Sequence, residues 1–221
     1  MGVIKALDGN AAIAHGVMRS KVQLVAAYPI TPQTPIVETI SSLIDKKEYD
    51  ATYITVESEH SALSAVIGAA STGVRTFTAS ASHGLALMHE VTGVASASRL
   101  PVVMAVVSRA IPGPMCLWCD HSDIMTQRDQ GWIQLFAESP QEGLDFTMIA
   151  YRTSEDERVL TPTMVDIDGF YCSHLTEPVD VPTEDEAERF ISEFRPVNAQ
   201  LNTDMPYAID NLSSPAIFTE I

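Results

Sequence analysis

The chain has 221 residues, 46% of them apolar and 19% charged, which is typical of a folded globular protein and excludes a disordered segment. Thirteen basic and 29 acidic residues give a net charge of −16, which argues against nucleic acid or an anionic membrane as partner. Three cysteines are too few for a disulfide framework. The sequence has no apolar run of about 18 residues and no signal-peptide pattern, so we expect a cytoplasmic protein.

Six apolar runs alternate with helical patterns along most of the chain. They span residues 23–28, 51–56, 74–80, 100–108, 132–137 and 158–167. Such alternation predicts an α/β fold, with a parallel sheet of about six strands flanked by helices. We expect this domain to cover residues 1–194. The irregular, proline-punctuated residues 195–221 are expected to form a tail or a linker toward a second domain.

Three helix starts are indicated by capping residues. Thr34 precedes a first-turn proline, and Ser139 and Thr183 stand three residues before Glu142 and Glu186. A hydroxyl at the N-cap and a glutamate three residues later satisfy the free amides of a first turn. These features are structural and predict where the helices begin.

Two helical stretches, residues 61–73 and 84–99, are built mainly from Ala, Ser and Gly. A surface helix would carry Lys and Glu on its outer face. We therefore expect both helices to be buried on most sides, in part against another subunit.

Acidic residues concentrate in the second half of the chain. Residues 138–193 hold fifteen acids and three arginines, which is −12 of the −16. This segment is either a docking face for a partner or a solvated surface.

Four loops follow predicted strands, at residues 28–34, 56–62, 78–84 and 108–123. In a parallel α/β sheet the ligand crevice lies at the carboxyl ends of the strands. We expect the four loops to converge on one rim, which would hold the site.

Three residues of this rim suggest a chemistry. Arg109 and Thr31 could hold a substrate carboxylate, and Glu59, if burial raised its pKa, could share a proton with a ring nitrogen. Each also has a structural explanation. Glu59 could be a first-turn carboxylate favoured by the helix dipole, Arg109 could form an ion pair, and Thr31 could be a hydroxyl in a turn.

Metal and nucleotide motifs are weak. Cys116 and Cys119 are separated by two residues, as in many metal-binding or redox cysteine pairs. A zinc or iron–sulfur site, however, needs about four ligands, and Cys172 is the only other cysteine. The histidines show no HxxxH or HxH spacing, and there is no P-loop or GxGxxG. We expect no metal ligands in this chain.

Several segments together resemble a known family. In order they are "YPITPQTPIVE", "VESEHSALSAVIGAASTGVRTFTASASHGLALMHE", "LPVVMAVVSRA", "WCDHSDIMTQRDQGWIQLFAESPQEGLD" and "MVDIDGFYCSH". They resemble the alpha chain of 2-oxoacid:ferredoxin oxidoreductases over roughly residues 7–181. The resemblance implies the pyrimidine-binding domain of a thiamine diphosphate enzyme.

The resemblance also implies roles for individual residues. Glu59 would pair with the aminopyrimidine of the cofactor, Thr31 and Arg109 would contact the substrate carboxylate, and Pro29, Ser82 and His83 would line the cofactor. The two prolines of "YPITP" restrict the backbone and would present Thr31 with little freedom to lose. His83 stands where the family has Gln, and Cys119 where Asn is common. These departures leave the particular 2-oxo acid open.

The implied reaction needs other chains. The family oxidatively decarboxylates a 2-oxo acid, here favouring pyruvate, to acyl-CoA and CO2 and passes electrons to ferredoxin. Three cysteines cannot hold the iron–sulfur clusters and no GDG…N motif holds the diphosphate through Mg²⁺. A beta chain is expected to bind the diphosphate and a cluster, alongside a gamma chain and a ferredoxin-like delta chain. The clusters and coenzyme A would be bound largely by these partners.

Some alternatives stay open at this point. The substrate could be a branched-chain or aryl 2-oxo acid, 2-oxoglutarate or oxalate, or the chain could be a non-catalytic scaffold. The reaction could run as oxidation or as reductive carboxylation. The chain could also be a split subunit or a fragment of a longer alpha chain.

Overall fold

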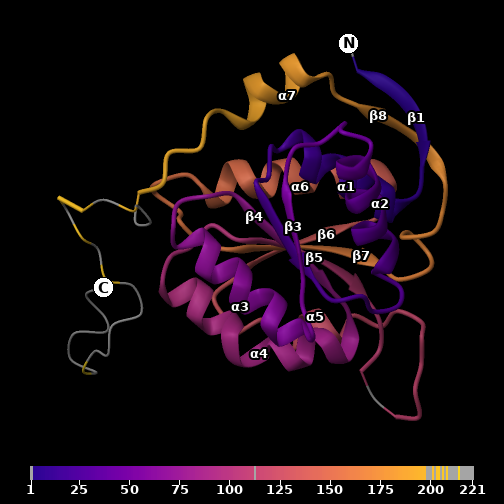
Figure 1. The fold of residues 1–221 in the computed structure, drawn as a ribbon. Coiled ribbons are helices and arrows are strands. Elements are labelled where there is room, and N and C mark those ends of the chain that lie inside the picture. Colours follow the sequence, from indigo (N-terminus) through magenta and orange to yellow (C-terminus); the bar gives the residue numbers. More distant parts are fainter. Residues whose placement is uncertain are drawn as a thin grey trace.

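The structure, a computed structural model, describes residues 2–111 and 113–197 and the single positions 201, 203, 204, 206, 208 and 214. Its main sheet has six parallel strands in the order β3-β2-β4-β5-β7-β6 (Figure 1). The strands are β2 (Leu24–Ala27), β3 (Thr52–Thr55), β4 (Thr76–Ser80), β5 (Val103–Ser108), β6 (Ile133–Ala137) and β7 (Thr163–Asp168). Each lies within a predicted apolar run or overlaps it, so the α/β fold is confirmed.

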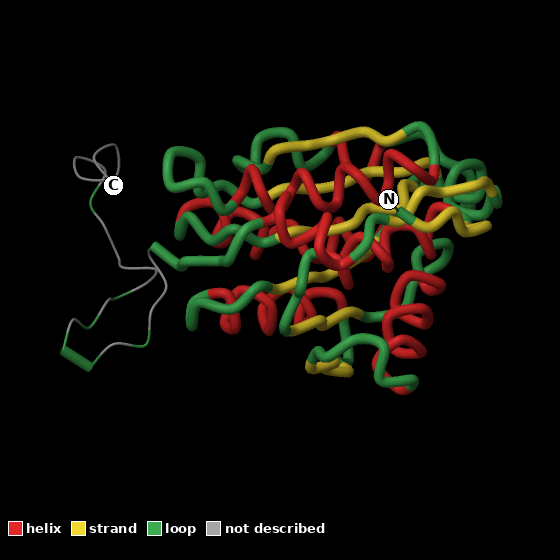
Figure 2. The backbone as a smooth tube through the Cα atoms, turned by 90° about the horizontal axis from the view of Figure 1, so that it is seen from above, coloured by secondary structure: helices red, strands yellow, loops and turns green. Residues whose placement is uncertain are grey.

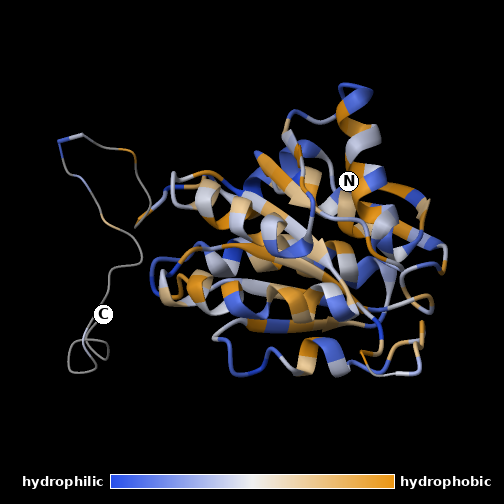
Figure 3. Cartoon of the chain, turned by 60° about the horizontal axis from the view of Figure 1, so that its bottom comes forward, coloured by the Kyte–Doolittle hydropathy of each residue, from blue (hydrophilic) through white to orange (hydrophobic). Residues whose placement is uncertain are grey.

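Helices cover both faces of this sheet. One face carries α1 (Gly9–Arg19), α2 (Thr34–Asp45) and α6 (Pro140–Ser154), and the other carries α3 (Glu59–Ala70), α4 (Ser82–Ala97) and the short α5 (Ser122–Met125) (Figure 1). Figure 3 shows apolar strands enclosed between these helix layers.

The central strand β5 contributes side chains to two hydrophobic cores, one on each face of the sheet. Val103, Ala105 and Val107 pack in the cluster on the α1 side, and Met104 and Val106 in the cluster on the α3 side. All five are fully buried. Successive side chains of a strand point to opposite faces of the sheet, and both faces are covered here, so every residue of β5 up to Val107 is apolar.

An antiparallel pair lies outside the main sheet. It joins β1 (Val3–Leu7) to β8 (Glu177–Val181), and α7 (Glu184–Ile191) follows (Figures 1 and 2). Neither strand was predicted from the sequence, because β1 buries no residue completely and so lacks a continuous apolar run. Nor was α1, whose residues are buried almost throughout and give no polar face to mark a helix.

The predicted helix starts are mostly correct. Ser139 accepts from the Glu142 amide at 3.2 Å, and Thr183 and Glu186 form a full capping box. Thr34 was expected at the N-cap of α2 but is its first residue. A hydrogen-bonded turn already brings the Thr34 amide to the Ile30 carbonyl, so the helix starts from Gln33, whose side chain makes no cap.

The two small-residue helices turn one side to the sheet. Ala62, Leu63 and Val66 of α3 are fully buried, whereas the outward Leu87 of α4 is 51% exposed. Burial against another subunit therefore stays a prediction.

The predicted tail of residues 195–221 lies largely outside the described residues. Residues 192–194 before it and residues 195–197 at its start contain no helix or strand. Among the described residues, no helix is both long and apolar enough to cross a membrane.

Candidate functional site

The carboxyl ends of the parallel strands form one rim of the sheet. Four loops reach it, at residues 28–33 after β2, 56–58 after β3, 81 after β4 and 109–121 after β5. Gly169 closes the rim behind β7, because a Cβ there would lie 2.3 Å from the Ser108 carbonyl oxygen and 2.8 Å from Cγ of Pro32. The predicted convergence of the four loops is present.

Arg109 is a buried cation at the centre of this rim. It follows β5 directly and is 6% exposed. Its Nη1 donates to the Thr31 carbonyl oxygen at 2.7 Å, and Nη2 lies 3.5 Å from Nδ1 of His83. Its Nε has no hydrogen-bond partner, and no carboxylate of the described residues forms an ion pair with it. The guanidinium therefore has spare donors.

Thr31 is exposed and lies in the loop after β2, next to this guanidinium. The structure brings Thr31 and Arg109 together as predicted, but the contact uses the Thr31 main chain. The Thr31–Pro32 peptide is cis, and Pro29 nearby is exposed. The Thr31 hydroxyl is thus not needed for the contact with Arg109.

Ser82 and His83 form the floor next to Arg109. Ser82 has a positive φ of 46°, and its hydroxyl donates to the Ala110 carbonyl at 2.8 Å. The same hydroxyl lies 3.1 Å from Nδ1 of His83, which is exposed. The Ser82 hydroxyl links the start of α4 to the loop after β5. Of Ser82 and His83, only His83 is exposed to solvent.

Glu59 is the first residue of α3 and is 8% exposed. Ser58 caps the helix by accepting from the Ser61 amide at 3.2 Å, and a carboxylate in the first turn is favoured by the helix dipole. A Cβ on Gly84 would lie 2.6 Å from both Oε1 of Glu59 and Oγ of Ser80. The Ser80 hydroxyl has no hydrogen-bond partner. The missing side chain of Gly84 therefore makes room for a buried carboxylate and a free hydroxyl.

Asp123 holds this arrangement, and the sequence analysis did not assign it to the site. Its side chain is fully buried. Oδ2 accepts from the amides of Ser82 at 2.7 Å and Arg109 at 2.9 Å, and Oδ1 lies 2.9 Å from Oγ of Ser108. The only signal was an acidic residue in the first turn of a short helix after the β5 loop.

Cys116, Cys119 and Cys172 do not form a common metal-binding cluster. All three are free thiols. Burial, together with a hydrogen bond to Asp168, raises the pKa of Cys119 to about 12, and burial raises the pKa of Cys172 to about 12.

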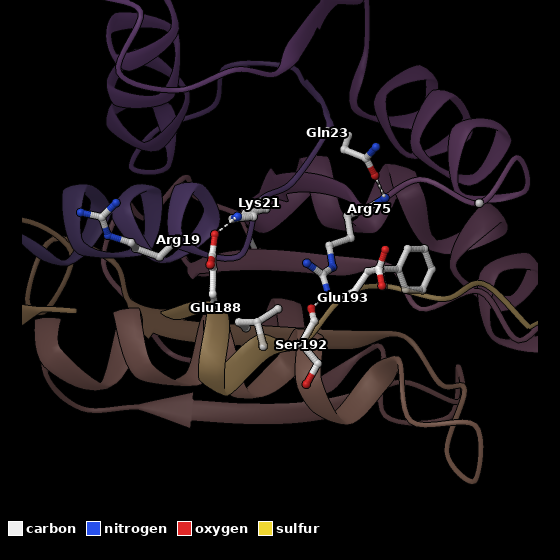
Figure 4. A pocket seen from close by; sticks show the side chains of 10 residues that line it. Arg19, Lys21, Gln23, Arg75, Glu188, Ser192 and Glu193 are labelled. Atoms are coloured by element: carbon white, nitrogen blue, oxygen red, sulfur yellow. Dashed lines mark hydrogen bonds and ion pairs between the residues drawn. The ribbon is translucent and has the colours of Figure 1, made fainter. Parts of the chain in front are cut away.

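A hollow of about 620 Å³ lies at the opposite, amino end of the strands (Figure 4). Two of its three cations are paired with carboxylates, and the third, Arg19, donates through Nε to the Pro182 carbonyl at 2.7 Å. Lys21 contacts Glu188, and Arg75 holds Glu155 through Nε at 2.6 Å. This hollow lies away from the carboxyl ends of the strands, where parallel α/β sheets bind their ligands, so we do not place the site there.

Comparisons with known proteins identify the family of this chain. The family described as "Pyruvate flavodoxin/ferredoxin oxidoreductase, thiamine diP-bdg" matches residues 15–221. Pyruvate synthase subunit PorA of Pyrococcus furiosus is 46% identical over 220 residues, which is 100% of this chain and 56% of the relative. PorA of Thermotoga maritima is 49% identical over 201 residues, 91% of this chain and 51% of the relative.

Ketoisovalerate oxidoreductase subunit VorA of Pyrococcus furiosus is 44% identical over 216 residues, 98% of this chain and 54% of the relative. A solved 2-oxoglutarate:ferredoxin oxidoreductase from Magnetococcus marinus, with 2-oxoglutarate, coenzyme A and succinyl-CoA bound, matches with a TM-score of 0.73 at 25% identity. That match covers 82% of this chain and 32% of the other. The chain spans about half the length of the curated relatives. It belongs to the thiamine diphosphate-binding family of pyruvate flavodoxin/ferredoxin oxidoreductases.

Proposed function

We propose that this chain is a subunit of a thiamine diphosphate-dependent 2-oxoacid:ferredoxin oxidoreductase that acts on pyruvate. The observation that carries the proposal is the buried guanidinium of Arg109, which has an unpartnered Nε at the carboxyl end of the sheet. A buried cation without a counter-ion favours binding of an anion. The names of the relatives indicate that this anion is the carboxylate of a 2-oxo acid.

The residues at the start of α3 and α4 fit the cofactor. Glu59 is buried beside the space left by Gly84, and Ser80 presents an unpartnered hydroxyl to the same space. A buried carboxylate can share a proton with a ring nitrogen. We assign Glu59 to the aminopyrimidine, with Pro29, Ser82 and His83 lining the ring. When bound, the cofactor supplies the electron sink that decarboxylation requires.

The chain's own contribution is to orient the acid. Arg109 would hold the carboxylate with charge-assisted hydrogen bonds, and the Thr31 hydroxyl would approach from the loop after β2. Asp123 fixes both Ser82 and Arg109 through their amides, so the acid and the ring would meet in a set geometry. Fixed orientation of reacting groups is a large part of catalysis.

The remaining parts are assigned to partners. A beta chain would hold the diphosphate with Mg²⁺ and a cluster, and gamma and ferredoxin-like delta chains would complete a complex that reduces ferredoxin. The products would be CO2 and an acyl-CoA. Coenzyme A bound in the matched Magnetococcus marinus structure supports this part of the proposal. A cytoplasmic location stays a prediction.

A second candidate substrate is 2-oxoisovalerate, because the ketoisovalerate subunit is almost as similar as the pyruvate subunits. The kcat/KM values of the purified complex for the two acids decide between them. We expect pyruvate to be the better substrate.

The function is tested by reduction of a viologen dye by the complex with pyruvate and coenzyme A. Glu59→Gln should lose about 100-fold or more, the usual size of a lost proton-transfer group. Glu57→Gln is the matched control, because Glu57 is exposed two residues away and accepts from the Ser61 hydroxyl at 2.6 Å. Full activity in Glu59→Gln, or equal loss in both, would contradict the assignment.

A further inference from the structure

Three different metal-binding groups meet at the edge of the rim. Cys119 and His121 come from the loop after β5, and Asp168 ends β7. Sγ of Cys119 lies 2.9 Å from Oδ1 of Asp168, and Nε2 of His121 lies 3.0 Å from the same oxygen. The three ligand atoms all lie within 4.8 Å of one another. All three residues are partly exposed, so an ion could reach them.

A second, buried carboxylate stands behind the histidine. Oδ2 of Asp166 lies 2.9 Å from Nδ1 of His121, and Asp166 is 1% exposed. Apart from this contact, neither of the two atoms has a hydrogen-bond partner. The other carboxylate oxygen of Asp166 accepts from the Ser108 hydroxyl, which orients it.

This arrangement is the one that metal-bound histidines use. Such a histidine coordinates the ion through one ring nitrogen, while the other nitrogen donates to a carboxylate. Here Asp166 faces Nδ1, and Nε2 is the nitrogen turned toward Cys119 and Asp168. With the ion on Nε2, Nδ1 would carry the hydrogen and donate it to the buried oxygen of Asp166.

The ligand set selects the kind of ion. Thiolate and imidazole favour Zn²⁺ and related transition metals, whereas Mg²⁺ and Ca²⁺ prefer oxygen ligands alone. Three protein ligands leave a fourth tetrahedral position open to water or to another ligand.

We propose that Cys119, His121 and Asp168 bind one divalent transition-metal ion of the Zn²⁺ type, with Asp166 as the hydrogen-bonding support of His121. The ion would cross-link the loop after β5 to the end of β7. This loop begins with Arg109, and Asp166 shares Ser108 with Asp123, so the ion would also stiffen the rim.

The test is the zinc content of the purified protein with its partner subunits. After chelator treatment the sample is titrated with Zn²⁺ in competition with a chromogenic chelator. Zinc is measured because any iron–sulfur clusters of partner chains contain iron and do not contribute. We expect about one equivalent of zinc per copy of this chain.

Variants locate the ion. Cys119→Ser and His121→Gln should each abolish the tight equivalent, and Asp166→Asn should weaken it about 10- to 100-fold, as supporting carboxylates do. Cys116→Ser is the matched control and should bind as the wild type does, because Cys116 is not part of the cluster.

A second measurement needs no variant. Zn²⁺ should slow alkylation of Cys119, followed by mass spectrometry of the intact complex, while alkylation of Cys116 continues unchanged. Absence of a tight zinc equivalent would overturn the proposal. It would also be overturned by binding that survives in both Cys119→Ser and His121→Gln, or by equal protection of both cysteines.

Discussion

Two buried arginines at opposite ends of the sheet differ in how they are paired. Arg75 precedes β4 at the amino end and gives Glu155 two hydrogen bonds, at 2.6 and 2.7 Å. Its other donors reach the carbonyls of Ser20 at 3.0 Å and Ser192 at 2.9 Å. Arg109 at the carboxyl end has one strong hydrogen bond, to the Thr31 carbonyl, and an unpartnered Nε.

Arg75 joins elements of the fold, whereas Arg109, as proposed above, would bind a ligand. A buried charge is costly unless it is paired and hydrogen-bonded. Arg75 meets this condition within the chain and links α6 to the segment after α7. Arg109 does not, so a substrate carboxylate would complete its coordination. Loss of Arg75 should therefore harm the fold, and loss of Arg109 the function.

The largest expected effect is on the paired arginine. Arg75→Met should lower the free energy of unfolding by about 3–5 kcal/mol, because it leaves the buried carboxylate of Glu155 without a partner. Urea unfolding of the purified protein measures this.

The double variant Arg75→Met with Glu155→Leu sharpens the result. Removing both charges should recover most of the lost stability, since two apolar groups leave no buried charge unpaired. A double variant as unstable as Arg75→Met alone would show that the pair is not the cause.

Arg109→Met should give the opposite pattern. We expect kcat/KM for the 2-oxo acid to fall about 10- to 150-fold, corresponding to about 1.5–3 kcal/mol for hydrogen bonds to a charged group. Stability should change by about 1 kcal/mol or less. A loss of stability as large as that of Arg75→Met would remove the contrast between the two arginines.

Thr31→Ala should have a smaller effect on the same step. A neutral hydrogen bond from the hydroxyl contributes about 1 kcal/mol, so kcat/KM should fall about fivefold while unfolding is unchanged. The contact with Arg109 uses the main chain and survives the substitution. Thr34→Ala, in the first turn of α2, is the control. An unchanged kcat/KM in Thr31→Ala would remove the hydroxyl from the site.

The smallest effect concerns pH. Burial raises the pKa of Glu155 above its ordinary value of 4.5, although Arg75 opposes the shift. The folded state then binds a proton that the unfolded state releases, so Glu155's contribution to stability is full below about 4.5 and falls as the pH rises through the folded pKa. Urea unfolding of wild type and Glu155→Gln across this window should show the gap between them changing in that direction. A gap that widens in favour of wild type as the pH rises would contradict it.

Sequence patterns predicted the parts of the fold that depend on local order. The six strands of the main sheet and the capping residues Ser139 and Thr183 are indicated by short runs of consecutive residues, and they were found, whereas Thr34 lies inside α2 and does not cap it. α1 was missed because its burial comes from packing between α2 and α6 and leaves no amphipathic stripe. β1 and β8 were missed because their pairing joins residues far apart in the chain.

The site shows the same limit. Arg109 and Thr31 were predicted from the loops that carry them, and Ser82 and His83 from the family resemblance, and the structure joins the four by hydrogen-bond contacts. The role of Asp123 could not be predicted, because its partners stand 14 and 41 residues away. The cluster of Cys119, His121 and Asp168 was hidden for the same reason, since one ligand comes from another strand.

The double hydrogen bond to Asp123 has a consequence for how this protein can vary. The excursion after β5 is closed at its base by the Ala110 amide bonded to the Trp118 carbonyl at 3.0 Å, and Asp123 then fixes Arg109 and Ser82. Residues 113–117 lie inside the closure formed by Ala110 and Trp118, so we expect that they can change in sequence without moving the guanidinium. The loop is therefore a place where substrate choice or partner choice could be retuned while the anion-holding geometry is inherited unchanged.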